Sequence, residues 1–127
     1  MKTRTILFTL IFAIGSLFIL SAQETIKIGI IGLDTSHSIA FTKLLNGESK
    51  NDKYSKFTIV AAYPYGSKTI KSSYDRIPGY IEQVKALGVE VVPSIEELLK
   101  KVDCVMLETN DGNLHLEQAN EVFKSGK

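Results

Sequence analysis

The residues best able to do chemistry lie in one short stretch that reads Gly-Leu-Asp-Thr-Ser-His. It follows an apolar, largely β-branched run over 26–31 and precedes a segment whose apolar residues have helical spacing. A glycine turn that opens a helix presents free backbone N–H groups, and neighbouring hydroxyls add donors, so such a turn binds anions. The expected centre of an anion site therefore comprises Gly32, Leu33, Asp34, Thr35, Ser36 and His37.

The spacing of this stretch departs from the G-x-G-x-x-G fingerprint of dinucleotide-binding turns. Gly32 matches the first glycine, but Asp34 and His37 stand at the second and third positions. A carboxylate there repels a diphosphate by a few kcal/mol at roughly 4 Å, for an effective dielectric constant near 20. Two interpretations stay open for Asp34, Thr35 and Ser36: an anion site, or an ordinary helix cap. His37 either contacts a phosphate or is a partly exposed structural residue.

A second set of polar residues lies at the end of the apolar run over 57–63 and just after it: Tyr63, Ser67 and Lys68. Sites that bind NAD usually place a carboxylate here to hold the ribose hydroxyls, and residues 63–68 contain none. Ser67 and Lys68 are able to bind a 2′-phosphate instead, which favours NADP. The alternative for Lys68 is a solvated turn lysine.

A third polar group, with Thr109, Asn110 and His115, follows the apolar run over 103–108. Residues at the carboxyl ends of strands in an open α/β sheet favour ligand binding. Glu108 and Asp111 stand near the same edge and have the chemistry for acid–base work. The alternative role in this loop is structural, with Asn113 capping the last helix.

Alternating strands and helices must position these groups. The sequence predicts strands at 26–31, 57–63, 89–92 and 103–108, and helices starting near 36 and covering 80–87, 94–101 and 114–124. On the first helix, Ile39, Phe41, Leu44 and Leu45 are expected on one face, and 47–56 and 68–79 are expected to be loops. The alternation predicts a Rossmann-like, doubly wound parallel α/β sheet, incomplete at about four strands.

Composition excludes several classes of function. A net charge of +1 without a Lys/Arg block predicts no attraction to nucleic acid. Cys104 is the only cysteine, so an intramolecular disulfide is impossible, and its apolar run predicts that it packs as a small hydrophobe. The two histidines, His37 and His115, are too far apart in sequence to form a metal motif, and no G-x-S-x-G hydrolase motif occurs. We expect neither a metal site nor a catalytic residue within this chain.

Residues 1–22 have the order of a secretory signal peptide: Lys2 and Arg4, an apolar run over 6–20, then Ser21 and Ala22 before a cut. The apolar run is shorter than the roughly 20 residues of a spanning helix, so a retained anchor is the weaker alternative. We expect a signal peptide over 1–22, a partial nucleotide-binding domain over 23–127, a periplasmic or secreted location, and no stable membrane insertion after cleavage.

Four stretches resemble the N-terminal nucleotide-binding domain of the glucose–fructose oxidoreductase/inositol dehydrogenase (Gfo/Idh/MocA) family. They read IGIIG at 28–32, FTIVAAY at 57–63, GVEVVPSIEELLKKVDCVML at 88–107 and TNDGNLHLEQANEVFKSGK at 109–127. The order GV, serine, helix with ELL, then D-x-V is the most specific of them. Thr109, Asn110 and His115 resemble the family's Thr-Pro-Asn…His loop near the nicotinamide ribose, with one extra residue in the spacing.

This resemblance implies the nucleotide-binding part of an exported oxidoreductase that uses NAD or NADP on a sugar or polyol and forms a possible homo-oligomer. The family's catalytic lysine lies in a Glu-Lys-Pro motif followed by a C-terminal domain, and this sequence contains no such motif. The chain is therefore expected to be a fragment or a truncated product. The alternative is a non-catalytic exported module that binds a carbohydrate or a partner, favoured by the departures from the glycine fingerprint.

Overall fold

The computed structural model describes residues 24–48 and 50–127, so the predicted signal peptide lies outside the described residues. The strands are β1 (Ile26–Ile31), β2 (Phe57–Tyr63), β3 (Glu90–Val91) and β4 (Cys104–Leu107). The helices are α2 (Ser36–Asn46), α3 (Lys71–Tyr74), α4 (Ile77–Ala86), α5 (Ile95–Leu99) and α6 (Gly112–Lys124), with a 3-10 turn, η1, at Asp52–Tyr54. The bounds of β1 and β2 are those predicted from the sequence.

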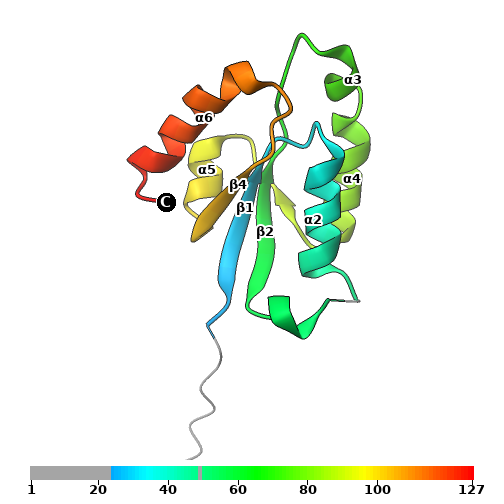
Figure 1. Ribbon diagram of the computed structural model, residues 1–127, viewed down its shortest axis with the longest axis vertical. Coiled ribbons are helices and arrows are strands. Elements are labelled where there is room, and N and C mark those ends of the chain that lie inside the picture. Colours follow the sequence, from blue (N-terminus) through cyan, green and yellow to red (C-terminus); the bar gives the residue numbers. More distant parts are fainter. Residues whose placement is uncertain (1–23, 49) are drawn as a thin grey trace, which may run out of the picture.

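The four strands form one parallel sheet in the order β3-β2-β1-β4, with helices on both sides (Figure 1). Helices α2 and α4 cover one face, and α5 and α6 cover the other. The chain thus winds outward from β1 in one direction and then crosses back to β4, which is a Rossmann-like arrangement. All carboxyl ends of the strands lie at one edge of the sheet.

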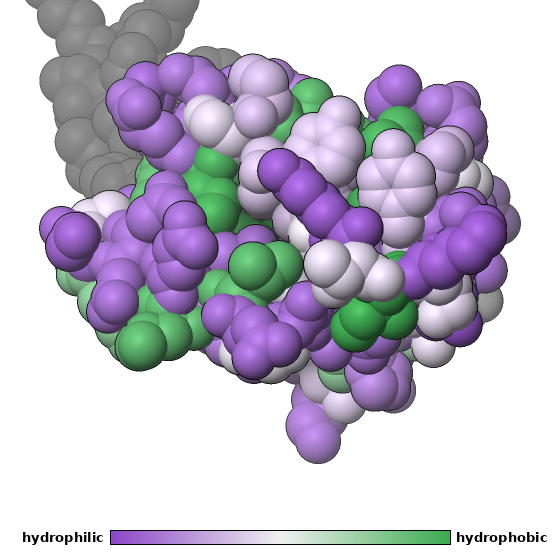
Figure 2. Space-filling view, turned by 90° about the horizontal axis from the view of Figure 1, so that it is seen from above, coloured by the Kyte–Doolittle hydropathy of each residue, from purple (hydrophilic) through white to green (hydrophobic). Residues whose placement is uncertain are grey.

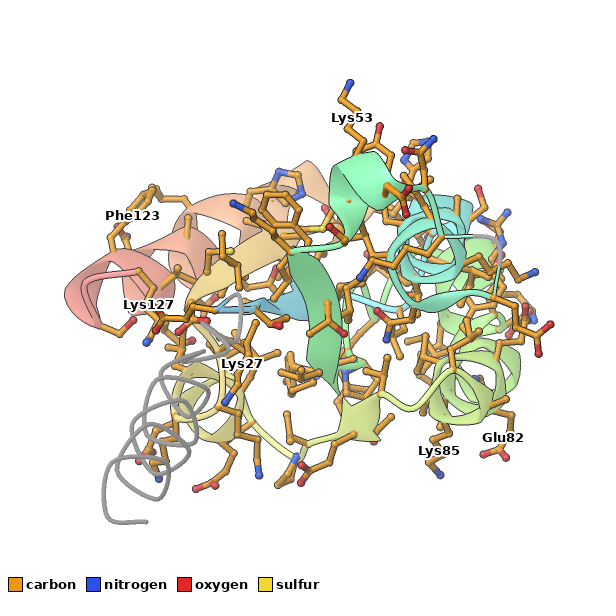
Figure 3. All side chains as sticks on the ribbon, turned by 90° about the horizontal axis from the view of Figure 1, so that it is seen from below. Lys27, Lys53, Glu82, Lys85, Phe123 and Lys127 are labelled. Carbon is orange, nitrogen blue, oxygen red and sulfur yellow. The ribbon has the colours of Figure 1, made fainter. Side chains whose placement is uncertain are left out.

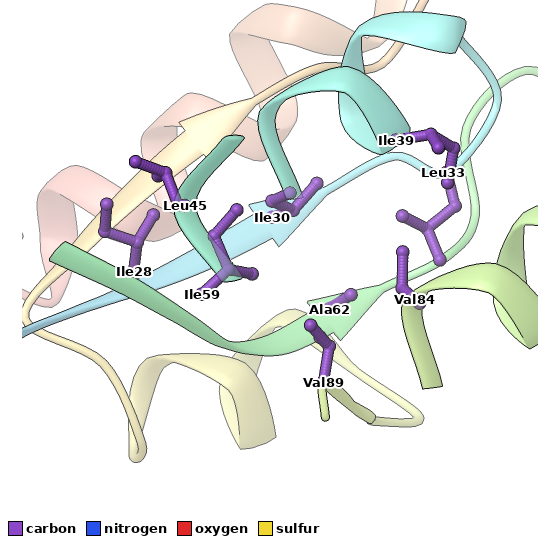
Figure 4. Packing of buried hydrophobic residues seen from close by; sticks show 9 residues of the cluster. All are labelled: Ile28, Ile30, Leu33, Ile39, Leu45, Ile59, Ala62, Val84 and Val89. Atoms are coloured by element: carbon purple, nitrogen blue, oxygen red, sulfur yellow. The ribbon is translucent and has the colours of Figure 1, made fainter. Parts of the chain in front are cut away.

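The core forms because the central strands carry apolar side chains on both faces. Ile28, Ile30 and Ile59 pack under α2 and α4 (Figure 4). Ile31 and Ala61 face α5 and α6. Burying a side chain of the size of isoleucine stabilises a fold by roughly 1.5–3 kcal/mol, so these strands anchor the polar loops that follow them.

Helix α2 buries a face partly different from the predicted one. Ile39 and Leu45 are buried as expected, but Leu44 is 43% exposed. Ser38 and Thr42 are fully buried instead. Their hydroxyls donate to backbone carbonyls, from Ser38 Oγ to Gly32 O at 2.7 Å and from Thr42 Oγ1 to Ser38 O at 2.7 Å, which removes the cost of burying them.

The predicted loop over 68–79 is wrong from Lys71 onward, where α3 and the start of α4 lie. Pro78 and Gly79 belong to the first turn of α4, where a proline loses no helical hydrogen bond. The region 47–56 contains the short turn η1. Strand β3 and helix α5 are shorter than predicted, although Ser94 caps α5 as expected, accepting from the N–H of Glu97 at 3.2 Å.

The prediction that Cys104 packs in the core is wrong, because its side chain is exposed. Strand β4 pairs with β1 alone, so within the described residues its outer edge has no partner strand. Burial of part of the side chain, with the nearby Asp103 carboxylate, still raises the pKa of the Cys104 thiol. Among the residues described, no helix is long and apolar enough to cross a membrane.

Candidate functional site

Three loops meet at the carboxyl edge of the sheet: β1–α2, β2–α3 and β4–α6. Backbone hydrogen bonds continue beyond the strands, from Gly32 N to Tyr63 O and from Leu33 N to Pro64 O, both at 2.9 Å. Gly32 has a φ of +92°, and a Cβ there would lie 2.6 Å from backbone atoms of Thr109. The glycine is therefore required both by its conformation and by the close approach of the β4–α6 loop. Seen from this edge, the surface is mostly hydrophilic with smaller apolar patches (Figure 2).

Asp34 lies at the centre of the three loops, and its side chain is completely buried. Its Oδ2 accepts the N–H of Ser67 at 3.2 Å, and its Oδ1 accepts the N–H of Asn110 at 3.1 Å. Gly66 packs so closely that an added Cβ would lie 2.1 Å from Oδ2. The carboxylate thus ties β1–α2 to the other two loops and does not cap α2. The cap of α2 is Thr35, whose Oγ1 accepts the N–H of His37 at 3.4 Å.

Ser67 is a second buried polar centre, 1% exposed. Its Oγ donates to Asp111 Oδ2 at 2.9 Å and accepts the N–H groups of Thr69 at 3.2 Å and Ile70 at 3.1 Å. These bonds use the hydroxyl within the chain. The predicted role of Ser67 as a phosphate donor is therefore not supported by the geometry, whereas Lys68 is exposed.

Asp111, rather than Asn113, caps α6, because its Oδ1 accepts the N–H of Asn113 at 3.0 Å. The hydrogen bond from Ser67, followed by those from Asn113, holds the pKa of the Asp111 carboxyl below its usual range. The neighbouring Asn110 side chain contacts α3, where its Nδ2 donates to Ser73 Oγ at 2.8 Å. The β4–α6 loop is thus attached to the β2–α3 region at two points.

A pocket of about 300 Å³ lies between the ends of β1 and β4, the point where the strand order reverses. We call it the switch-point pocket. Its lining residues are Thr35, His37, Leu107, Glu108, Thr109, Asn110 and His115. Burial raises the pKa of the Glu108 carboxyl, and the nearby His37 opposes this shift. His115 Nε2 lies 2.5 Å from the carbonyl oxygen of Thr109, which fixes the ring against the loop.

A second pocket, of about 350 Å³, lies between the end of β2 and α6, and we call it the tyrosine pocket. Tyr63 and Tyr65 line it with their rings edge to face, 5.6 Å between centroids. Gln118 also lines it and is 7% exposed. In the described part of the chain, Gln118 Oε1 has no hydrogen-bond partner. A buried acceptor without a donor is costly, so a donor-bearing ligand would stabilise it.

The structure brings most of the predicted residues together in two groups. Thr35, His37, Thr109, Asn110 and His115 meet in the switch-point pocket, while Tyr63 and Lys68 line the tyrosine pocket. Gly32 forms the turn, and Ser36 is exposed at the start of α2. Leu33, predicted as a ligand contact, is completely buried in the core.

Sequence reasoning missed Gln118, Glu117 and Glu121, which also line the tyrosine pocket. Their helical spacing in α6 was a usable signal, because residues three and four apart share a helix face. Among the described residues, no cluster of three or more His, Cys, Asp or Glu side chains is suited to a metal ion.

The fold and the site together define a Rossmann-like α/β domain with a polar crevice at its switch point. Comparison with solved structures finds a similar arrangement in UDP-N-acetylglucosamine 3-dehydrogenase from Acidithiobacillus ferrooxidans, with a TM-score of 0.54 and 16% sequence identity. The match covers 80% of this chain and 26% of the dehydrogenase, so the chain spans about a quarter of that protein. At this identity the likeness concerns the fold. No family model matches the sequence, and neither does any curated protein.

Proposed function

We propose that the chain is the nucleotide-binding part of an NAD(P)-dependent oxidoreductase that acts on a sugar or polyol. One observation carries this proposal: the polar ends of β1 and β4 meet in a pocket at the point where the strand order reverses. Ligands of open α/β sheets bind in the crevice at such a point. The similar fold in a sugar-nucleotide dehydrogenase supports the same class of ligand.

The residues present fit a dinucleotide at two places. The N-terminus of α2, with the exposed Ser36 and the hydroxyl of Thr35, suits a phosphate. The tyrosine pocket suits an adenosine, since Tyr63 and Tyr65 offer aromatic edges and the unpartnered Gln118 Oε1 suits an amino group. A bound nicotinamide would supply the hydride-transfer chemistry, and these residues would hold and orient it.

Titration of the full chain with NAD⁺, NADP⁺, NADH and NADPH by calorimetry tests this proposal. We expect saturable binding of at least one nucleotide, lost in Ser36→Trp because the indole would cover the start of α2. The matched control is Ser55→Trp, another exposed serine that precedes β2 at the opposite edge of the sheet. Failure of all four nucleotides to bind folded protein, purified without a retained cofactor, would refute the proposal.

Asp34 favours a second candidate, a non-catalytic module that binds a carbohydrate or a partner. The buried carboxylate stands where a dinucleotide-binding turn has its second glycine, and both of its oxygens are bonded within the chain. These bonds connect the three loops without a diphosphate. Binding of a sugar or polyol by protein that binds none of the four nucleotides would support this candidate.

We also propose that the chain is exported, on the basis of the basic, apolar and small-residue order of residues 1–22. Expression of the full chain in a bacterial host, followed by mass spectrometry of the periplasmic fraction, tests this. A mature N-terminus at Gln23 is the expected result. Recovery of the uncleaved chain from the cytoplasm alone would contradict export.

A further inference from the structure

The tyrosine pocket has a marked imbalance of charge among the residues that line it. In the described part of the chain, its lining includes three acidic residues, Asp111, Glu117 and Glu121, against one basic residue, Lys68. All three acidic residues belong to α6 or to its N-cap. The sequence alone did not predict that α6 lies beside the end of β2. A pocket lined in this way favours a neutral, donor-rich ligand and disfavours an anion.

The hydroxyl of Ser67 is already used within the chain, because it donates to Asp111 and accepts two backbone N–H groups, so it does not serve as a donor to a ligand phosphate. Among the described residues that line the pocket, Lys68 is the one cation. The pKa of the Tyr63 hydroxyl is raised by burial first, and then by Glu121, Tyr65 and Glu117, which agrees with a negative potential at the end of β2.

Resting on the proposed function, we propose that the tyrosine pocket selects NAD(H) over NADP(H), through the carboxylates that α6 presents to it. The pocket lies beside the end of β2, where a dinucleotide-binding sheet holds the ribose of the adenosine. A free 2′-hydroxyl donates to a carboxylate, whereas a 2′-phosphate brings about two negative charges beside three others. This selectivity is the reverse of the preference for NADP that Ser67 and Lys68 suggest from the sequence.

The expected size of the effect follows from the exposure of these groups. Glu117 and Glu121 are exposed, so solvent screens part of their repulsion. We expect NADPH to bind at least about tenfold more weakly than NADH, equivalent to about 1.4 kcal/mol. Since the effect is electrostatic, the ratio of the NADPH to the NADH dissociation constant falls as the salt concentration rises.

The test measures the dissociation constants of NADH and NADPH by fluorescence for the full chain and two charge-reversal variants. Glu121→Lys places a cation beside the pocket. We expect it to improve NADPH binding severalfold and so to lower the ratio of the NADPH to the NADH dissociation constant. The control Glu82→Lys makes the same change of net charge on α4, on the other side of the molecule from α6 (Figure 3). Glu82 is exposed, and among the described residues its ion-pair partner is Lys85, at 3.4 Å, so the control should leave the ratio unchanged.

The outcomes separate this inference from the proposed function. Equal or tighter binding of NADPH by the unmodified chain would overturn the selectivity and leave the proposed function standing. An equal shift of the ratio in Glu121→Lys and Glu82→Lys would assign the effect to net charge and overturn the role of α6. Binding of neither nucleotide would refute the proposed function and the inference together. A tenfold preference for NADH that narrows only in Glu121→Lys would establish the role of α6.

Discussion

At the scale of single residues, Asp34 shows how a buried charge is made tolerable. A carboxylate without partners in an apolar interior costs several kcal/mol, and hydrogen-bond donors reduce this cost. Asp34 receives two backbone N–H groups, from Ser67 and Asn110, one at each oxygen. The same bonds fix the separation of the β2–α3 and β4–α6 loops, so the residue shapes both pockets without lining either.

We predict that Asp34→Asn destabilises the fold by about 1–3 kcal/mol. Both Asp34 oxygens accept a backbone N–H, and in asparagine an NH₂ group replaces one of these oxygens, so one backbone N–H loses its acceptor. Urea unfolding at pH 7 measures the change. The control is Asp75→Asn, an exposed residue paired with Lys71 at 2.5 Å, where the expected loss is about 0.5 kcal/mol. Equal losses in the two variants would show that Asp34 does not hold the loops together.

At the scale of elements, Asn46 joins the end of α2 to an irregularity in β2. The register passes from Ile28 opposite Ile59 to Gly29 opposite Ala61, which leaves Val60 as an extra residue. Beside this bulge the Asn46 side chain hydrogen-bonds the backbone of β2, as a neighbouring strand would. Its Oδ1 accepts the N–H of Ile59 at 2.9 Å, and its Nδ2 donates to the Ile59 carbonyl at 2.7 Å.

We predict that Asn46→Ala destabilises the fold by about 2–3 kcal/mol, because two backbone groups of β2 lose their partner. Thermal and urea unfolding measure this loss. Asn51→Ala is the matched control: Asn51 caps η1 through one exposed bond to the N–H of Lys53, so about 0.5–1 kcal/mol is expected. A loss at Asn46 no larger than at Asn51 would contradict the role of Asn46.

At the scale of the whole molecule, the edge formed by β4 is the feature most able to cause association. Within the described chain β4 pairs on one side only, and Cys104 is exposed on it. An open strand edge is a template for pairing with another strand.

We predict that the full chain forms concentration-dependent oligomers and that Cys104→Lys shifts them toward monomer, since a charged side chain protects an edge. Size-exclusion chromatography with light scattering measures the masses. Ser55→Lys adds the same charge away from β4 and should leave association unchanged. A single monomeric species across the concentration range would refute association through this edge.

The sequence by itself determined the parts of the fold that depend on neighbouring residues. The apolar runs of β1 and β2 and the capping Ser94 were predicted at their observed positions, because periodicity and capping are local properties. The polar ends of the strands were also expected at one edge, since parallel strands place their carboxyl ends together.

Only the tertiary structure decided what each polar side chain does there. Asp34 and Asn110 are 76 residues apart in sequence, so no local pattern announces their hydrogen bond. Likewise, Cys104 is exposed because of the position of β4 in the sheet, and Gln118 is buried because α6 packs beside the end of β2. Burial and hydrogen-bond partners depend on contacts between distant segments, and the chemistry of a site depends on those contacts.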